Sequence, residues 1–562
     1  MKETGYIPFA AMVMLMFLLL WDCHLCKADP TRTKFKAAVY EHAVFLPEDM
    51  HTVVSRQEAL RVMRQNLAVF SEQAAEAKRQ VVDILVFPED GIYGMGFTRE
   101  ALEPYLEYIP DPEHDHWIPC DDPNRYSNTE VQYELSCMAK RNQMFIVANI
   151  GDRQPCTRSQ RDCPADLHFQ FNTDVAYDPN GRMIARYHKR HLFYEYQFDT
   201  PEAKVVSFDT PFGRWGMFTC FDILFYDPAV TAVQRHGIAN IAFPTAWMDA
   251  LPLLASVGFH SAFARLFGVN FLAANIHMPS YRFHGSGIYS PRGQAAFYHN
   301  ASLTSAPKLI VAELETLKKP TPESYEDAGE DGQLADPAIA TSEDNSVENG
   351  TKEESIETET VSFVSVLFHD LFHFVELDRP EGVLRTCHNR VCCHLNYSLT
   401  PDVENRDMFA FGAFDGEHTV EGDYYLQICA LVRCANQSRH SCGSPTNQSE
   451  TMFHFLSISG SFETGYVFPE VLLTTETNHL RLAEADEWSF ADKQIRSERG
   501  FGYPLLAAAL FGRDYTRDGE IWTPKAAEDA MDIDTGAAIR FEGDTLFVSS
   551  VAAFVSLQRL WI

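Results

Sequence analysis

Basic residues are scarce in this chain of 562 residues, and they form no dense run anywhere. Lys and Arg together number 46, against 78 Asp and Glu, which gives a formal net charge of -32 at pH 7. A chain this acidic repels polyanions, so the composition excludes a protein that binds nucleic acid by electrostatic attraction. We interpret the acidity as a source of solubility rather than as a functional feature.

Apolar side chains, by contrast, are abundant. Hydrophobic residues make up 46% of the chain and aromatic residues 12%, which is enough for sizeable cores. The length exceeds that of one ordinary domain. We therefore expect two folded domains.

Residues 1–28 have the pattern of a secretory signal peptide. Lys2 precedes an uncharged apolar block from Tyr6 to Trp21, and a cleavage site is expected after Ala28. An uncleaved membrane anchor is the alternative, because the block is as long as the shortest membrane spans. Five sequons follow, which indicates a secreted, extracellular glycoprotein. The sequon asparagines are Asn300, Asn349, Asn396, Asn436 and Asn447.

The thirteen cysteines indicate disulfide bonds and one odd thiol. Two of them lie in the predicted signal peptide, which leaves eleven, a number that cannot pair completely within the chain. Four lie in or beside polar loops of the N-terminal half and six cluster between 387 and 442, whereas Cys220 stands alone. We predict five disulfides among the other ten, with the six C-terminal cysteines paired among themselves. Adjacent Cys392 and Cys393 should take different partners. The alternative is a zinc site formed by Cys387, Cys392, Cys393, His388 and His394.

Residues 34–316 alternate segments that are typical of strands and helices. Strands are expected over 35–44, 81–87 and 144–150, and helices over 55–79 and 132–142. A hairpin is indicated where 174–189 turns around Asp178-Pro179-Asn180-Gly181. Three more strands are expected over 212–220, 239–247 and 269–277, the first two leading into helices. This pattern predicts an α/β domain with stacked sheets.

The composition changes abruptly after this domain. Residues 318–360 are acidic, nearly free of aromatic side chains and without pattern, so we predict a disordered insertion or linker. Residues 361–520 combine alternating strand patterns with the cysteine cluster, which predicts a smaller, disulfide-stapled, mainly-β domain. The tail, 521–562, has small residues, a polar spacer and an apolar end, the order of a GPI-attachment signal. An ordinary terminal strand or helix is the alternative.

Three chemically capable side chains follow predicted strands: Glu89, Lys189 and Cys220. In such sheets the strand ends meet at a crevice. A thiol nucleophile needs a base and donors for the developing oxyanion. We expect Glu89 to act as general acid and base, and Lys189 to favour the thiolate and stabilise the oxyanion together with the backbone N–H of Phe221. Taken singly, each residue also fits a plain structural role as turn acid, surface lysine or packed thiol.

The segments around these residues resemble a known family. FPEDGIYG, RYHKRHLF and FTCFDILFYDP, in this order, resemble the Glu, Lys and Cys motifs of the nitrilase superfamily of carbon-nitrogen hydrolases. FPTAWMDALPLL, VNFLAANIH and GSGIYSP are similar to its secreted branch, the vanins and biotinidase, and the similarity extends from about residue 35 to about 520. The resemblance implies a nitrilase-type α-β-β-α sandwich with Glu89 as base, Lys189 at the oxyanion and Cys220 as nucleophile. The insertion 318–360 departs from the family pattern.

This resemblance implies hydrolysis of a linear amide through a cysteine acyl-enzyme, with no metal or organic cofactor. The implied substrate is pantetheine, which would yield pantothenate and cysteamine, and the alternative is biocytin, which would yield biotin and lysine. A secreted glycoprotein that keeps the fold only for binding is the non-enzymatic alternative.

Further expectations concern the substrate pocket and the partners. Trp247 and Thr245 are candidates for substrate contact, although Trp247 fits a core position equally well, and Glu195 is a candidate second glutamate near the site. The expected partner is a small-molecule amide. We infer no nucleic acid, no obligate protein partner, and membrane attachment only through the GPI anchor.

Overall fold

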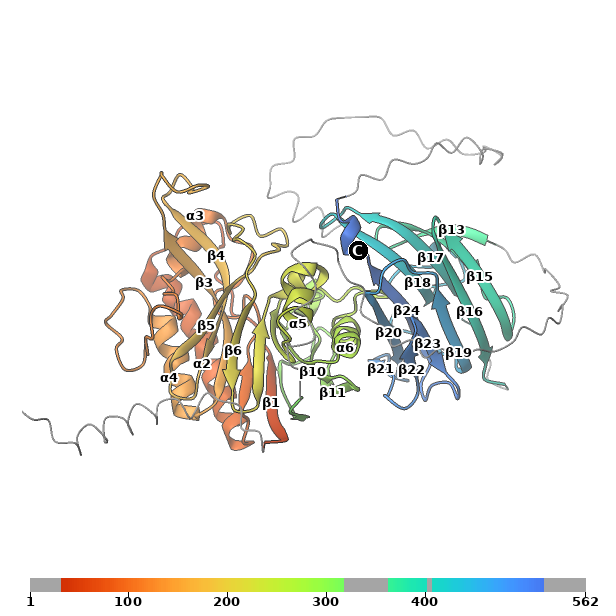
Figure 1. The fold of residues 1–562 in the computed structure, drawn as a ribbon, viewed down its shortest axis with the longest axis horizontal. Helices are drawn as coiled ribbons and strands as arrows, with labels where there is room; N and C mark the ends of the chain where they lie inside the picture. The colour runs from red at the N-terminus through yellow and green to blue at the C-terminus, as the bar shows by residue number, and fades with distance from the viewer. Residues whose placement is uncertain (1–31, 318–361, 402–406, 520–562) are drawn as a thin grey trace, which may run out of the picture. The chain divides into compact units, whose positions relative to one another are not determined.

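The computed structural model of the chain is shown in Figure 1. It describes residues 32–317, 362–401 and 407–519. The predicted signal peptide, the acidic segment 318–360, the sequon at Asn349 and the tail 521–562 lie outside the described residues. Within the described ranges, no helix is both long and apolar enough to cross a membrane.

Two six-stranded sheets carry the first half of the described chain. Their strand orders are β12-β1-β2-β3-β4-β5 and β11-β10-β9-β8-β7-β6. In each sheet three neighbouring strands are parallel, β1-β2-β3 and β7-β8-β9. The strands are β1 (Lys34–Glu41), β2 (Ile84–Val86), β3 (Phe145–Pro155), β4 (His168–Tyr177), β5 (Met183–His188), β6 (Val206–Thr210), β7 (Gly213–Met217), β8 (Asn240–Thr245), β9 (Asn270–Asn275), β10 (Ser286–Ser290), β11 (Gly293–Tyr298) and β12 (Lys308–Glu315).

These two sheets pack face to face, and helices cover their outer faces. Val39 and Val86 of the first sheet share one buried cluster with Ala242 and Leu272 of the second. The helices α2 (Arg56–Arg79) and α4 (Glu130–Asn142) bury their apolar faces on the other side of the first sheet, and α6 (Ser256–Phe267) packs on the second. The predicted α-β-β-α sandwich is therefore confirmed.

The helix α2 shows how local sequence signals set these elements. Ser55 caps its N-terminus by accepting a hydrogen bond from the amide of Glu58. Lys78 and Arg79 occupy the last turn, where positive charge favours the helix dipole. The shorter helices are α3 (Arg99–Leu102) and α5 (Thr231–Gln234), with 3-10 turns at Glu103–Tyr105 and Pro279–Tyr281.

Two details differ from the sequence expectation. The strand expected over 81–87 is limited to Ile84–Val86, because Val81 has a left-handed backbone (φ 60°) and Pro88 cannot continue a ladder. No long helix follows the strand at 212–220. Instead a 3-10 turn (Cys220–Leu224), a π turn (Tyr226–Val230) and α5 follow one another, and Asp227 inside the π turn has a non-helical backbone.

The second half of the described chain is all β, in a seven-stranded sheet, β13-β14-β17-β18-β24-β20-β21, and a five-stranded sheet, β15-β16-β19-β23-β22. A separate buried cluster lies between these sheets. This confirms the predicted mainly-β character. The strands are β13 (Ser362–Leu367), β14 (Asp370–Glu376), β15 (Glu381–His388), β16 (Val391–Leu399), β17 (Phe409–His418), β18 (Tyr424–Arg433), β19 (Phe453–Gly460), β20 (Val467–Thr474), β21 (Leu480–Leu482), β22 (Ser489–Ala491), β23 (Gln494–Ser497) and β24 (Leu505–Arg513), with 3-10 turns at Arg439–Ser441 and Tyr515–Arg517.

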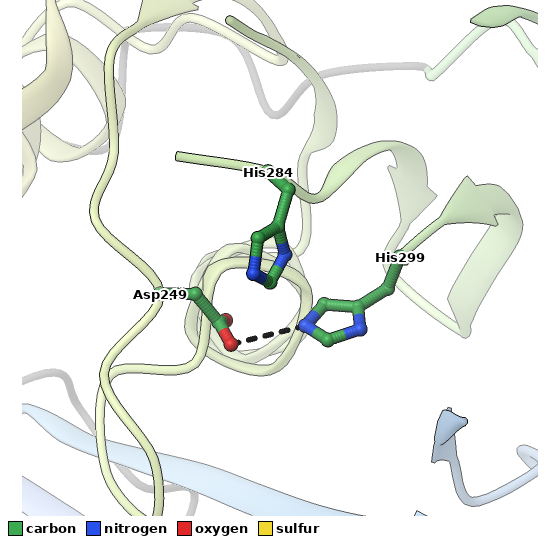
Figure 2. Close-up of side chains that lie close together, drawn as sticks. All are labelled: Asp249, His284 and His299. Carbon is green, nitrogen blue, oxygen red and sulfur yellow. Dashed lines mark hydrogen bonds and ion pairs between the residues drawn. The ribbon is translucent and has the colours of Figure 1, made fainter. Parts of the chain in front are cut away.

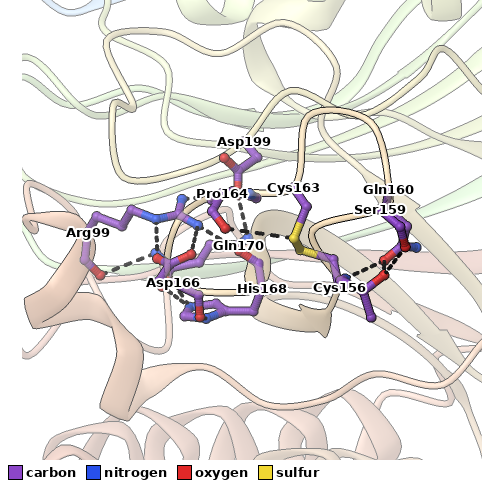
Figure 3. The surroundings of a disulfide bond; sticks show 11 residues. Arg99, Cys156, Ser159, Gln160, Cys163, Pro164, Asp166, His168, Gln170 and Asp199 are labelled. Atoms are coloured by element: carbon purple, nitrogen blue, oxygen red, sulfur yellow. Dashed lines mark hydrogen bonds and ion pairs between the residues drawn. A yellow bond between two sulfur atoms is a disulfide. The ribbon is translucent and has the colours of Figure 1, made fainter.

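Five disulfides form, and Cys220 is the free cysteine of the described residues. This confirms the predicted count, the pairing of the C-terminal six among themselves, and the different partners of Cys392 and Cys393. The alternative zinc site is wrong, because its cysteines are bonded to sulfur. The pairs are Cys120–Cys137, Cys156–Cys163, Cys387–Cys392, Cys393–Cys429 and Cys434–Cys442. Figure 3 shows the second pair closing the loop between β3 and β4, beside a cluster in which Arg99 binds Asp166 and Asp199.

The β domain contacts the α/β domain at several places. The buried guanidinium of Arg513 donates through Nε to the carbonyl of Leu224 at 2.8 Å. Tyr194 donates its hydroxyl to the carbonyl of Val420 at 2.8 Å. A Cβ on Gly422 would lie only 3.1 Å from the ring of Phe221, the residue after Cys220. The turn between β17 and β18 therefore packs against the segment that holds the free thiol.

Candidate active site

Glu89, Lys189 and Cys220 each follow a strand of the sandwich and converge at one buried place. Glu89 lies three residues after β2, Lys189 directly after β5, and Cys220 three residues after β7. Their exposed fractions are 1%, 2% and 6%. The ammonium of Lys189 lies 2.6 Å from Oε1 of Glu89, and the charges of both residues act on the Cys220 thiol. The structure thus brings together residues that are far apart in the sequence.

The carboxylate of Glu89 is held by three donors. Its Oε1 accepts from Lys189 Nζ at 2.6 Å and from Asn172 Nδ2 at 2.8 Å. Its Oε2 accepts from the backbone amide of Ala246 at 2.8 Å, directly after β8. Hydrogen bonds from charged and backbone donors fix both the position and the rotation of a carboxylate. Glu89 is therefore preorganised, and residues from both sheets hold it.

Lys189 lies between two carboxylates, because Glu195 binds its ammonium as well. Burial alone lowers the pKa of Lys189, but the charges of Glu195 and Glu89 outweigh it and hold the pKa well above its usual value. Burial raises the pKa of Glu195, and Lys189 opposes that shift. The amide of Phe193 also donates to Glu195, at 3.0 Å. The lysine is therefore a permanent cation in this site.

An asparagine that the sequence analysis did not single out joins the two glutamates. Asn172 lies in β4 and its Nδ2 donates to Oε1 of Glu89 at 2.8 Å and to Oε1 of Glu195 at 2.6 Å. Asn149 of β3 donates to Asn172 Oδ1 at 2.6 Å and to Asp174 at 2.9 Å. The available signal was the polar side chains within otherwise apolar strands, since a buried amide needs partners.

Cys220 has a backbone conformation that is unusual for a residue with a side chain. Its φ is 46°, in the left-handed region, between an extended Thr219 and the 3-10 turn that follows. Such strain costs about 1–3 kcal/mol and is concentrated at functional sites. Asp222 fixes the turn by accepting from the Thr219 amide at 3.1 Å and from the Tyr187 hydroxyl at 2.6 Å. The fold therefore tolerates a strained backbone at the residue whose conformation sets the direction of the Cys220 sulfur.

The electrostatics of the site keep this sulfur protonated at rest. Burial raises the pKa of the Cys220 thiol well above its usual value, and the negative charge of Glu89 acts in the same direction. The charge of Lys189 and the nearby polar groups of Thr245 and the Ala246 amide oppose these effects without cancelling them. The resting site therefore contains a thiol beside a carboxylate that can take its proton.

The two predicted pocket residues lie in different surroundings. Thr245 ends β8 and is fully buried, its hydroxyl has no hydrogen-bond partner among the described residues, and it lowers the pKa of the Cys220 thiol. Trp247 is 6% exposed, and its indole N–H donates to the carbonyl of Leu254 at 2.9 Å. Its backbone amide donates to Asn275 Oδ1 at 2.9 Å. Trp247 therefore packs inside the loop that follows β8, while Thr245 belongs to the wall beside Cys220.

Comparison with known proteins agrees with this geometry. The carbon-nitrogen hydrolase model matches residues 57–314, and the vanin C-terminal domain model matches residues 362–518. A pantetheinase from Mus musculus is 46% identical over 88% of this chain and 91% of its own length. A pantetheinase from Canis lupus familiaris is 46% identical over 89% and 92%, and a biotinidase from Bos taurus is 39% identical over 88% and 94%.

Among solved structures, an amidase from Nesterenkonia sp. covers 52% of this chain and 93% of its own, at 19% identity and a TM-score of 0.35. The curated relatives and the two family models, by contrast, span nearly the whole described chain. Their identity over most of both lengths exceeds what a shared fold alone would require. The chain therefore belongs to the vanin and biotinidase branch of the carbon-nitrogen hydrolases, enzymes that act on non-peptide amide bonds.

Proposed function

We propose that this chain hydrolyses pantetheine to pantothenate and cysteamine through an acyl-enzyme on Cys220. The observation that carries the proposal is the buried contact of Glu89 with Lys189 beside a strained, free thiol. The pantetheinases at 46% identity over about nine-tenths of their length support this choice of substrate. Biocytin is the second candidate, supported by the biotinidases at 39–41% identity.

In the first half of the reaction the sulfur of Cys220 attacks the amide carbonyl carbon while Glu89 accepts the thiol proton. The carbonyl oxygen becomes an oxyanion, which Lys189 and the backbone N–H of Phe221 stabilise. Glu89 then returns the proton to the amide nitrogen, the carbon-nitrogen bond breaks, and cysteamine leaves. The pantothenoyl group remains on Cys220 as a thioester.

In the second half a water molecule attacks the thioester carbonyl, and Glu89 accepts a proton from that water. The second oxyanion uses the same donors. Its collapse breaks the carbon-sulfur bond, pantothenate leaves, and Glu89 returns the proton to sulfur. The rigid support of Glu89 by Lys189, Asn172 and Ala246 suits a residue that has to be base and acid in turn.

Glu195 takes the part of a positioning residue in this scheme, because it binds Lys189 and Asn172 rather than the thiol. Thr245 forms part of the wall beside the sulfur. Trp247 contributes indirectly, by supporting the loop whose Ala246 amide holds Glu89.

The proposed location is extracellular. Five disulfides support an oxidising compartment. Sequon asparagines at Asn396, Asn436 and Asn447 are exposed, and Asn300 is partly exposed, so a glycosyltransferase can reach them. Removal of a signal peptide and attachment of a GPI anchor at the tail complete this proposal. Release from expressing cells by a phosphatidylinositol-specific phospholipase C tests the anchor, and a protein found entirely in the medium with Ile562 intact would exclude it.

The substrate is tested by incubating the purified protein with pantetheine and with biocytin in parallel, and by measuring released cysteamine and lysine. We expect the larger kcat/KM for pantetheine, and faster turnover of biocytin would reverse the ranking. The mechanism is tested separately by mass spectrometry after an acid quench. Wild type should carry the acyl group on the peptide that contains Cys220, and Cys220→Ala should carry none. Turnover by a folded Cys220→Ala protein would refute the assignment of the nucleophile.

A further inference from the structure

A second cluster of chemically capable side chains lies in the loop region after β8. Asp249 belongs to the loop 246–255, His284 comes shortly before β10, and His299 follows β11 directly. Figure 2 shows the three side chains converging on one another. One potential ligand atom from each lies within 4.8 Å of the other two. None of the three is used in the proposed reaction.

The cluster is buried, and it leaves one nitrogen without a partner. His284 is 3% exposed, and its Nδ1 has no hydrogen-bond partner among the described residues. The side chains of Asp249 and His299 are 6% and 5% exposed, with Oδ2 of the aspartate 3.0 Å from Nε2 of the histidine. A buried polar atom without a partner is costly, so its presence calls for an occupant.

Hydrogen bonds from Ser256 orient the carboxylate of Asp249. Its Oδ1 accepts from the backbone amide of Ser256 at 2.9 Å and from the Ser256 hydroxyl at 3.0 Å, at the start of α6. This leaves Oδ2 to face His299. Metal-binding side chains are commonly held in this way by hydrogen bonds outside the ligand set.

The segments that carry the three residues are also tied together by their backbones. The Nδ2 of Asn275 donates to the carbonyls of Trp247 and His284, both at 3.0 Å. The amide of Asp249 donates to the carbonyl of Arg282 at 2.8 Å. The approach of Asp249 and His284 is therefore built into the fold rather than due to flexible side chains.

We propose that Asp249, His284 and His299 bind a Zn²⁺ ion. Two imidazole nitrogens and one carboxylate oxygen form a donor set typical of zinc, with a fourth position open to water. Zinc bonds of about 2.0–2.2 Å place tetrahedral ligand atoms about 3.4 Å apart. The Asp249 to His299 separation of 3.0 Å is close to this value, and a ligand atom of His284 lies within 4.8 Å of both.

Such an ion would join the three segments that carry Asp249, His284 and His299. The first of these segments also holds Glu89. The loop 246–255 begins with Ala246, whose amide donates to Glu89 at 2.8 Å. A metal bound to Asp249 binds the folded protein and not the unfolded chain, so it raises the melting temperature, and the rise grows with the ratio of free Zn²⁺ to Kd. The site does not depend on which amide the enzyme cleaves.

The test uses the purified full-length protein without a histidine tag. The protein is stripped with a chelator, dialysed against buffered Zn²⁺, and analysed for bound metal and for melting temperature. Co²⁺ replaces Zn²⁺ in a parallel sample, because its visible spectrum reports the ligand geometry. We expect one ion per chain, a tetrahedral cobalt spectrum and a higher melting temperature in the loaded protein.

His284→Gln is the decisive variant, since its Nδ1 has no hydrogen-bond partner to lose in the metal-free protein. Loss of a residue that only supports a metal ligand weakens metal binding about 10–100-fold. Loss of His284, a ligand itself, should weaken Zn²⁺ binding by more than that. His299→Gln should do the same. The matched control is His277→Gln, which breaks a buried histidine-carboxylate pair with Glu41 (2.7 Å) and should bind Zn²⁺ like wild type. Wild type without bound Zn²⁺, or His284→Gln with wild-type affinity, would overturn the proposal.

Discussion

Replacement of Asn172 by leucine should reduce turnover far more than it changes substrate binding. Asn172 is 1% exposed, and its Nδ2 donates to Glu89 at 2.8 Å and to Glu195 at 2.6 Å. Leucine has a similar size and excludes water, but it donates nothing. The two carboxylates then keep only Lys189 as a shared donor. Glu89 loses one of the contacts that fix its Oε1.

The size of the effect follows from the type of hydrogen bond. A bond to a charged group contributes about 1.5–3 kcal/mol. If the bond to Glu89 is fully felt in the transition state, kcat/KM falls about 10- to 150-fold, since 1.36 kcal/mol is one decade in rate. The loss should appear in kcat with little change in KM, because the side chain is enclosed by Glu89, Glu195 and Asn149 and does not form the wall beside the thiol.

The matched control is Asn270→Leu. Asn270 is also buried and its Nδ2 also donates twice, to Asn240 Oδ1 at 2.9 Å and to the carbonyl of Glu315 at 3.0 Å, and neither bond involves Glu89 or Glu195. Steady-state kinetics and thermal melting are measured on both variants, with the assay well below either melting temperature. Asn172→Leu activity within threefold of wild type would refute the reasoning. An equal loss in Asn270→Leu would show that general destabilisation, and not the position of Glu89, sets the rate.

Three other outcomes are expected. Lys189→Ala should lower kcat about 10²–10³-fold, the cost of one oxyanion donor, and wild-type kcat in a folded variant would exclude that role. Burial raises the pKa of Glu470 to about 8, so the native state holds this proton more tightly than the unfolded chain. The protonated Glu470 carboxyl therefore adds up to roughly 5 kcal/mol to the free energy of unfolding. This contribution is full below about pH 4 and is lost as the pH rises through 8. Urea unfolding at pH 6 and pH 9 should show a smaller fall in the free energy of unfolding for Glu470→Gln than for wild type. An unchanged pH dependence would contradict this effect of burial. Gly422→Val should displace the Phe221 ring, which a Cβ would already approach to 3.1 Å, and cost up to about 100-fold in kcat. Gly382→Val, whose Cβ has 3.6 Å of room, is its control, and equal kinetics of the two would disprove the effect.

Much of the fold follows from the sequence because its signals are local. The helix expected over 55–79 is α2, with Ser55 as its cap, and the hairpin around 178–181 joins β4 to β5. Apolar runs also located β3 and β9. The turn that begins at Cys220 could not be read in this way. Its shape depends on Asp222, which accepts hydrogen bonds from Tyr187 and from the amide of His191, more than thirty residues away.

The site shows the same division between local and distant causes. Distinctive segments pointed to Glu89, Lys189 and Cys220, and the structure brings these three side chains together, while their catalytic roles stay a prediction. Asn172 and Asn149 were missed, since a polar residue inside a strand looks like ordinary alternation until its partners are known. The zinc alternative at 387–394 failed for a related reason. Cysteine spacing fits both uses, and only the positions of the partner sulfurs decide between them.

The charges around Lys189 favour proton transfer during attack over a preformed thiolate. A thiolate at rest would be a third anion beside one cation that already binds Glu89 and Glu195, and burial raises the pKa of the thiol against it. In the proposed mechanism the proton passes from sulfur to Glu89 as negative charge moves to the carbonyl oxygen. Glu89 then no longer neutralises the lysine, and the oxyanion takes its place. Glu195 exchanges no proton in this scheme and keeps Lys189 fixed, so the site carries the same total charge before and after the attack. Two carboxylates around one buried lysine thus allow one of them to accept a proton without releasing the cation that stabilises the product of that transfer.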